Sequence, residues 1–268
     1  MENPYPKARK RCIIGAENTM RQKEETMNYQ SVLDLHTHTA ASGHAYCSLR
    51  EMAKAAADKG LKLLGITEHA PKMPGTCHSF YFHNLKVVPR QMYGIELLLG
   101  SEVNILDEEG HVDLEDVEIP KMDVIIASLH TPCIRPGTIK ENTNAYLNVM
   151  KNPYVNIIGH PDDGRYEIDY RALVEGAKKY GKVLELNNHS LAPDCFRKNA
   201  RENDTVILEL CREYQVPILM GSDAHFDTYI GEFPYAVSLL EELSFPEELV
   251  LNRSVEAVEK YVNRKLDI

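Results

Sequence analysis

The stretch S-V-L-D-L-H-T-H-T, residues 31–39, runs from a short apolar strand pattern directly into two histidines, His36 and His38. A doubly wound nucleotide-binding sheet would typically carry a glycine-rich turn at the end of its first strand. Histidines in that place favour a parallel barrel, whose chemistry lies at the carboxyl ends of its strands. Side chains two residues apart in extended chain project to the same side, roughly 7 Å apart, so both imidazoles can reach one metal centre.

The alternation of short apolar runs with amphipathic stretches continues along the chain. Strands are predicted over the ranges 32–35, 62–67, 95–102, 124–129, 155–159, 183–187 and 217–221. Helices are predicted over 48–59, from the capping box Thr138-x-x-Glu141 onward, and over 169–181, 203–214, 232–243 and 255–266. Strands this apolar indicate a parallel sheet covered by helices, so we expect an α/β fold and a seven-stranded barrel.

Residues 1–30 are polar and highly charged and lack a sustained apolar period, which predicts a poorly ordered N-terminal extension. Met20 and Met27 are alternative translation starts to Met1. The range 31–268 is then expected to form a single barrel domain.

Composition narrows the class of protein. The chain has 268 residues, of which 43% are hydrophobic and 26% charged, as in ordinary globular proteins. A net charge of -10 disfavours long nucleic acid as a partner. The six cysteines form no C-x-x-C pair, which favours a reducing, cytoplasmic location. No apolar stretch approaches the ~18 residues that span a bilayer, so no membrane partner is expected.

Metal-binding residue types follow six of the seven predicted strands. They are His36, His38, His44, His69, Glu102, His130, His160, Asp223 and His225. A single histidine at a strand end is more often structural than a ligand, but the joint pattern predicts a metal site at the carboxyl rim. Imidazoles with a few carboxylates suit zinc, manganese or iron, and nine donors fit two or three ions.

These residues lie in recognisable motifs: His36-Thr37-His38, Ile66-Thr67-Glu68-His69, Gly100-Ser101-Glu102, Ser128-Leu129-His130, Gly159-His160-Pro161 and Gly221-Ser222-Asp223-Ala224-His225. Together with the His44 loop, they resemble the PHP (polymerase and histidinol phosphatase) family of metal-dependent phosphoesterases over about residues 31–233. The stand-alone bacterial YcdX-like phosphatase branch is most similar, because Asn187-Asn188 and Gly231-Glu232-Phe233 also match.

The resemblance implies a PHP-type domain over 31–268, a distorted (β/α)7 TIM-like barrel with a trinuclear site. It implies three divalent ions, zinc before manganese or iron, with three ligand sets: His36, His38, Glu102 and Asp223; Glu102, His130 and His160; and His44, His69 and His225. Asp162-Asp163-Gly164 departs from the Gly-Asn-Pro of similar family members, which leaves the choice of substrate open.

A cytoplasmic phosphatase acting on small phosphomonoesters follows as the leading hypothesis. A hydroxide bridging two ions would attack phosphorus in line, with Asp223 and Glu102 as the catalytic carboxylates. Three divalent ions less two carboxylate charges make a pocket of about +4, which attracts a small phosphorylated metabolite. Candidate substrate contacts are Arg197, Arg165, His189 and Asn187.

Three alternatives remain open at this point: a histidinol phosphatase, a phosphodiesterase or exonuclease of the PHP family, and a non-catalytic metal-binding module. Glu68, beside His69, is a candidate proton donor to the leaving group. Its alternative role is to orient a metal-binding histidine. His78, His83 and His111 are expected to be surface residues.

Overall fold

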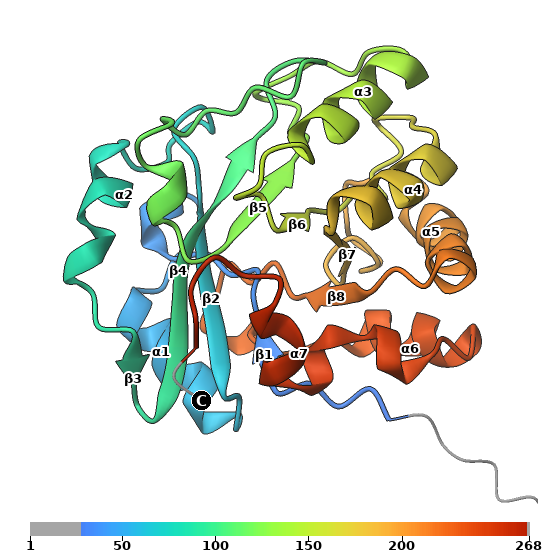
Figure 1. Cartoon of the computed structure of the whole chain (residues 1–268). Helices are drawn as coiled ribbons and strands as arrows, with labels where there is room; N and C mark the ends of the chain where they lie inside the picture. Colours follow the sequence, from blue (N-terminus) through green and yellow to red (C-terminus); the bar gives the residue numbers. More distant parts are fainter. Residues whose placement is uncertain (1–27, 267–268) are drawn as a thin grey trace, which may run out of the picture.

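Parallel strands follow one another around a nearly closed barrel in the computed structural model, which describes residues 28–266 (Figure 1). They are β1 (Leu33–Asp34), β2 (Leu63–His69), β4 (Ile95–Asn104), β5 (Ile125–Ser128), β6 (Ile157–Ile158), β7 (Val183–Asn187) and β8 (Ile218–Gly221), paired in that order. Each lies within or overlaps a predicted strand, and every neighbouring pair is parallel. The prediction of a seven-stranded α/β barrel is confirmed.

One further strand was not predicted. β3 (Gln91–Met92) pairs antiparallel with the start of β4. The connecting residues Tyr93 and Gly94 have φ of 53° and 82°, the pair of positive values that a tight two-residue hairpin turn requires. β4 also continues to Asn104, two residues past its predicted end, and this extension places the Asn104 side chain at the carboxyl rim.

The barrel closes between β1 and β8 with few backbone hydrogen bonds. At the carboxyl end, Thr37 and Ala224 form an isolated parallel bridge. At the other end, the buried side chain of Asn252 takes the place of backbone pairing. Its Oδ1 accepts from Met220 N at 2.7 Å, and its Nδ2 donates to Met220 O at 2.8 Å and to Leu33 O at 3.4 Å. We call this line of contact the β1–β8 seam.

Most of the helices cover the outside of the barrel (Figure 1). The helices are α1 (Leu49–Asp58), α2 (Phe80–Asn84), α3 (Ile139–Val149), α4 (Tyr170–Tyr180), α5 (Ala200–Tyr214), α6 (Pro234–Glu242) and α7 (Val255–Glu259). The capping boxes of Ser48 with Glu51 and of Thr138 with Glu141 are both present, as predicted.

Two helix boundaries were wrong. α5 begins three residues before the predicted range, after Asn199. α7 ends at Glu259 and not at residue 266. Beyond it, Asn263 N donates to Asp123 O at 2.8 Å, and its side-chain amide donates to Tyr154 O at 2.9 Å. These tertiary hydrogen bonds hold the segment in an irregular path, so the apolar spacing there does not produce a helix.

Side chains alternate between two apolar layers along each strand, as the pleat requires. Leu64 and Leu97 face outward into the layer beneath the helices. Leu63 and Leu98 face the barrel interior, where α7 contributes Val255 and Val258. The inner apolar layer fills the amino-terminal part of the barrel, which leaves the carboxyl rim for polar residues.

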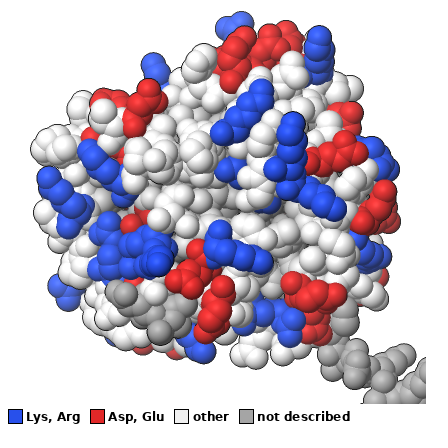
Figure 2. Space-filling model, in the orientation of Figure 1, with Lys and Arg blue, Asp and Glu red and all other residues white. Residues whose placement is uncertain are grey.

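The predicted N-terminal extension falls largely on residues 1–27, outside the described residues. Tyr29, within its predicted bounds, is buried, and its hydroxyl donates to Phe245 O at 2.5 Å. On the face in Figure 2, Lys and Arg side chains are interspersed with Asp and Glu side chains. None of the helices within residues 28–266 has both the length and the apolar character to cross a bilayer.

Candidate metal centre

All nine predicted ligands converge at the carboxyl rim of the barrel. Glu102 lies in β4 and His69 ends β2, while the others lie in the loops after β1, β5, β6 and β8. Two of them, His160 and Asp223, have positive φ of 27° and 55°, a conformation that costs free energy outside glycine. The local fold thus accepts strained backbone at two of the converging residues.

The first group lies across the β1–β8 seam. His36 Nε2 is 3.6 Å and His38 Nε2 is 3.3 Å from Asp223 Oδ1. Glu102 Oε2 is 3.4 Å from His36 Nε2 and 3.6 Å from His38 Nε2. These are the four residues of the first expected ligand set, and together they could hold one divalent ion.

The second group surrounds the other oxygen of Glu102. His130 Nε2 lies 3.2 Å and His160 Nε2 lies 2.9 Å from Glu102 Oε1. His69 Nδ1 is 2.7 Å from Glu102 Oε2, so it also approaches this group. Histidine nitrogens therefore lie near both oxygens of Glu102, and this carboxylate could be shared by two ions.

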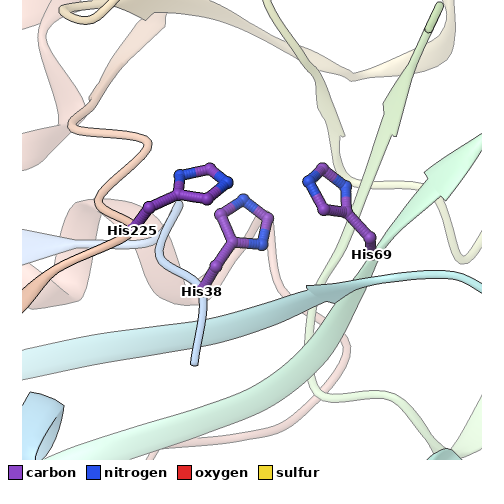
Figure 3. Close-up of side chains that lie close together, drawn as sticks. All are labelled: His38, His69 and His225. Carbon is purple, nitrogen blue, oxygen red and sulfur yellow. The ribbon is translucent and has the colours of Figure 1, made fainter. Parts of the chain in front are cut away.

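The third group contains the rings of His38, His69 and His225, which point toward one another from three separate segments (Figure 3). The His44 ring lies 4.9 Å from that of His69 and 4.8 Å from that of His225, measured between centroids. The expected third set is thus assembled. His69 differs from the expectation because it lies between the second and third groups and could serve either.

Hydrogen bonds to the far side of several rings settle which nitrogen faces the centre. His36 Nδ1 contacts Glu185 Oε1 at 2.6 Å, and His130 Nδ1 contacts Asn104 Oδ1 at 2.7 Å. Because these partners only accept, each Nδ1 carries a proton and each Nε2 points inward. In a neutral ring, that Nε2 presents a lone pair to carboxylate oxygens, an arrangement that is repulsive unless a cation lies between them.

The buried donors fit a metal for a second reason. His36 Nε2, His38 Nε2, His69 Nδ1 and Glu102 Oε2 are fully buried and have no hydrogen-bond partner among the described residues. Buried polar atoms without partners are costly, and these converge on one centre. Nitrogen with a few carboxylate oxygens is the donor set of zinc, manganese and iron sites.

The local electrostatics keep His38 and His130 neutral, the form that coordinates metals. Burial, together with His69 and His225, lowers the pKa of His38 well below its usual value. Burial lowers the pKa of His130 to about 4. For His36, burial opposes protonation, but Glu185, Asp223 and Glu102 raise its pKa well above the usual value. A divalent ion among those carboxylates would supply the same positive charge as that proton.

Glu68 is placed to orient a histidine and not to reach a leaving group. It is fully buried and accepts from Ser42 Oγ at 2.5 Å and from Thr39 N at 3.1 Å. Since Ser42 Oγ donates to Glu68, it accepts from His38 Nδ1, 3.3 Å away. This chain leaves His38 Nε2 facing the centre, which is the alternative role of Glu68.

A cavity of about 750 Å³ opens onto the centre. Five of the nine donors line it: His44, His69, His130, Asp223 and His225. Arg197, Arg165 and His189, three of the candidate substrate contacts, also line it.

Asn187 lies elsewhere, since it is fully buried and does not line the cavity. Its amide donates to Glu185 and Asp223 at 3.2 and 3.3 Å, and its oxygen accepts from Arg197 at 3.1 Å. All its polar groups are taken up within the protein. We therefore assign Asn187 to positioning and not to substrate contact.

Glu185 and Asn104 are among the residues around the centre that were not predicted. Glu185 holds His36 and also accepts from His160 N at 2.7 Å, and Asn104 holds His130. A carboxylate inside the apolar strand V-L-E-L-N was the available signal for Glu185, because an unpaired buried charge is costly. Asn104 gave no such signal, since the predicted strand ended before it.

Residues 34–243 match the family model for the PHP domain. The chain belongs to the PHP domain family. Curated relatives of similar length include a protein named probable phosphatase from Caldanaerobacter subterraneus subsp. tengcongensis, 46% identical over 240 residues that cover 89% of this chain and 94% of the relative. Another, from Caldicellulosiruptor saccharolyticus, is 49% identical over 224 residues, covering 84% and 92%. The family predicted from the motifs is confirmed.

A solved structure supports the same fold. The histidinol phosphate phosphatase of Lactococcus lactis subsp. lactis, solved with zinc, L-histidinol and phosphate, superposes with a TM-score of 0.55. The match covers 81% of this chain and 95% of that chain at 17% sequence identity. At this identity, the likeness concerns the fold.

Proposed function

We propose that the protein is a metal-dependent phosphatase that hydrolyses small phosphomonoesters at the centre formed by the nine donors. The observation that carries the proposal is the convergence of these donors, several with unpartnered buried atoms, at the floor of a cavity of about 750 Å³. The probable-phosphatase names of curated relatives support the same class of reaction.

The donors fit up to three divalent ions, which we expect to be zinc, with manganese or iron as alternatives. When bound, such ions lower the pKa of coordinated water and offset the charge of a phosphoryl group. The protein's part is to hold the donors in place. Glu185, Asn104 and Ser42 fix the ring orientations of His36, His130 and His38.

Asp223 serves as an orienting carboxylate in this proposal. Its Oδ1 faces His36 and His38, while its Oδ2 accepts from Arg197 Nη2 at 3.1 Å. Burial raises the pKa of Asp223, but His36, His38 and Arg197 hold it well below its usual value. Because His36 and His38 lie against one oxygen and Arg197 donates to the other, we assign Asp223 to positioning the reacting groups.

The matched experiment compares two His→Gln variants of the full chain. His130→Gln alters a donor of the centre, whereas His78→Gln alters an exposed histidine outside it. Both proteins and the wild type are stripped of metal, reloaded with zinc or manganese, and assayed with p-nitrophenyl phosphate beside elemental analysis. We expect wild-type and His78→Gln proteins to bind two to three equivalents and to turn over, and His130→Gln to lose metal and at least tenfold in kcat/KM.

A surface group of Asp107, Glu109 and His111 could add metal to that stoichiometry, and His111→Gln controls for it. Less than one equivalent of bound metal in the wild type, with no turnover on adding ions, would contradict the proposed function. Faster hydrolysis of bis-p-nitrophenyl phosphate than of the monoester would point to a phosphodiesterase. Full metal loading without hydrolysis of either ester would favour the alternative of a non-catalytic metal-binding module.

A further inference from the structure

Arg165 lies in a braced loop at the wall of the cavity, after β6. Gly164 N donates to Lys198 O at 2.8 Å, and Tyr166 N donates to Asp163 O at 2.9 Å. A side chain at Gly164 would collide with Lys198 O, because its Cβ would lie 2.6 Å from that oxygen. The close approach of the two loops therefore fixes the position of the backbone next to Arg165.

The guanidinium of Arg165 is itself held on one edge and one face. Its Nε donates to both oxygens of Asp163 at 2.9 Å, and its Nη2 donates to Asp163 Oδ2. Its Cζ lies 4.7 Å from the centroid of the Phe196 ring. No partner for Nη1 is found within residues 28–266, and the side chain is 22% exposed. An immobilised guanidinium that lines the cavity therefore keeps one edge without a partner among these residues.

Arg165 differs in this respect from Arg197, the other Lys or Arg that lines the cavity. The Arg197 side chain is 5% exposed, and its two terminal nitrogens donate to Asp223, Asn187 and Ser190. Both guanidinium groups contact the Phe196 ring, with the Arg197 Cζ 5.6 Å from its centroid. Arg197 is bonded to Asp223 at the centre, whereas Arg165 lines the same cavity and is bonded to Asp163.

Two acidic residues of the cavity, Asp194 and Glu232, bear on the charge that a substrate would meet. Glu232 is paired with Lys59 Nζ at 2.8 Å, which also donates to Ile230 O. Asp194 lies in the loop after β7 and has no such pairing within the described residues. The pre-ordered guanidinium is the stronger recognition element, because little side-chain entropy remains to be lost on binding.

We propose that Arg165 binds a second anionic group of the substrate, so that the preferred substrate is a phosphomonoester bearing a carboxylate or a second phosphate. This inference rests on the proposed function and specifies its substrate class. The free edge of a guanidinium matches a planar carboxylate or a phosphate, which both accept two parallel hydrogen bonds.

The test uses substrate pairs that differ mainly in a second anion. 3-Phosphoglycerate against glycerol 3-phosphate tests a carboxylate, and fructose 1,6-bisphosphate against fructose 6-phosphate tests a phosphate. For the zinc- or manganese-loaded wild type, we expect kcat/KM to be at least about tenfold higher for the substrate with the second anionic group in at least one pair. In Arg165→Gln, that ratio should fall to near one, mainly through KM, whereas Arg165→Lys should retain part of it.

Lys198→Gln is the matched control, because it removes an equal charge from the neighbouring loop outside the cavity lining. It should keep the wild-type ratio. Since Arg165→Gln leaves the buried Asp163 unpaired, the double variant Asp163→Asn/Arg165→Gln keeps the test valid if the single variant melts early.

Three results would overturn the inference while leaving the proposed function intact. The first is a wild-type ratio near one for both pairs with normal turnover of p-nitrophenyl phosphate. The second is an Arg165→Gln variant that loses the same factor on every substrate. The third is preference for an amine-bearing ester such as phosphoethanolamine, which would point to Asp194. Failure of the metal-loaded wild type on all monoesters would instead reject the proposed function itself, and the inference with it.

Discussion

Individual residues around the centre act by fixing which nitrogen of each imidazole faces inward. Glu185 and Asn104 can only accept from His36 and His130, and Ser42 accepts from His38 because its own proton goes to Glu68. A ring held in the other tautomer would present N–H to the centre and could not coordinate an ion. In the proposed metal centre, the positioning residues would therefore affect metal affinity without touching the metal.

Glu185→Gln tests this at the best-defined contact. The two carboxylate oxygens accept from His36 Nδ1 and His160 N, so a glutamine must direct its NH2 group at one of two donors. We expect metal affinity and kcat/KM to fall 10–100-fold, with the fold retained by circular dichroism. Unchanged zinc affinity in a competition titration would show that His36 does not depend on Glu185.

Ser42→Ala tests the chain from Glu68 to His38. The change removes the acceptor for His38 Nδ1 and leaves a buried oxygen of Glu68 with fewer donors, so we expect the free energy of unfolding to fall by about 1–3 kcal/mol. Ser238→Ala, on the exposed face of α6, is the control. In a double-mutant cycle with Glu68→Gln, additive losses of stability would contradict a shared network.

Secondary-structure elements with local signals were predicted well, and those set by tertiary contacts were not. The caps of α1, α3 and α4 are formed by Ser48, Thr138 and Asp169, all visible as sequence patterns. The segment after α7 follows hydrogen bonds of Asn263 to distant backbone, which no local pattern reveals. β3 has only two residues, too few for a strand period.

Glycines at inward positions of the strands make space for the polar layer. A Cβ at Gly221 of β8 would lie 1.9 Å from Glu185 Oε1 and 3.1 Å from His36 Cβ. Gly221→Ala should therefore displace Glu185, destabilise the protein by about 1–3 kcal/mol and lower bound metal. Combining it with Glu185→Asp, which shortens the carboxylate by one methylene, should recover part of the unfolding free energy measured in urea. A fully additive double variant would show that the two side chains do not compete for space.

At the scale of the whole molecule, the sequence was sufficient for the barrel and for which residues meet at its rim. Parallel strands place all their carboxyl ends together, so residues as far apart as His36 and His225 could be assigned to one region. The division of these residues into separate ligand groups was harder to predict from the sequence. His69 lies within reach of both Glu102 and the rings of His38 and His225, and that choice depends on side-chain directions in the folded barrel.

Metal binding at the proposed centre would have a consequence for the closure of the barrel. His36 and His38 follow β1, Asp223 follows β8, and the seam between these strands has few backbone hydrogen bonds. A cation shared by the three side chains would cross-link the seam. We therefore expect metal removal to loosen this part of the barrel more than β2 or β4, which pair over seven residues.

Calorimetry and hydrogen exchange of the chelated and zinc-reloaded full chain measure this effect. At a free zinc concentration 100 times Kd, binding at one site adds about 2.7 kcal/mol, which raises Tm by roughly 5–10 °C in a domain of this size. Exchange should rise on chelation in peptides covering residues 33–38 and 218–225, and less in those covering 95–104. Asp223→Asn should abolish most of the zinc-dependent gain, because it removes the only ligand that the β8 side supplies to this group, whereas His78→Gln should keep it. Equal exchange in both ranges, or a Tm indifferent to zinc, would mean that the donors do not clamp the seam.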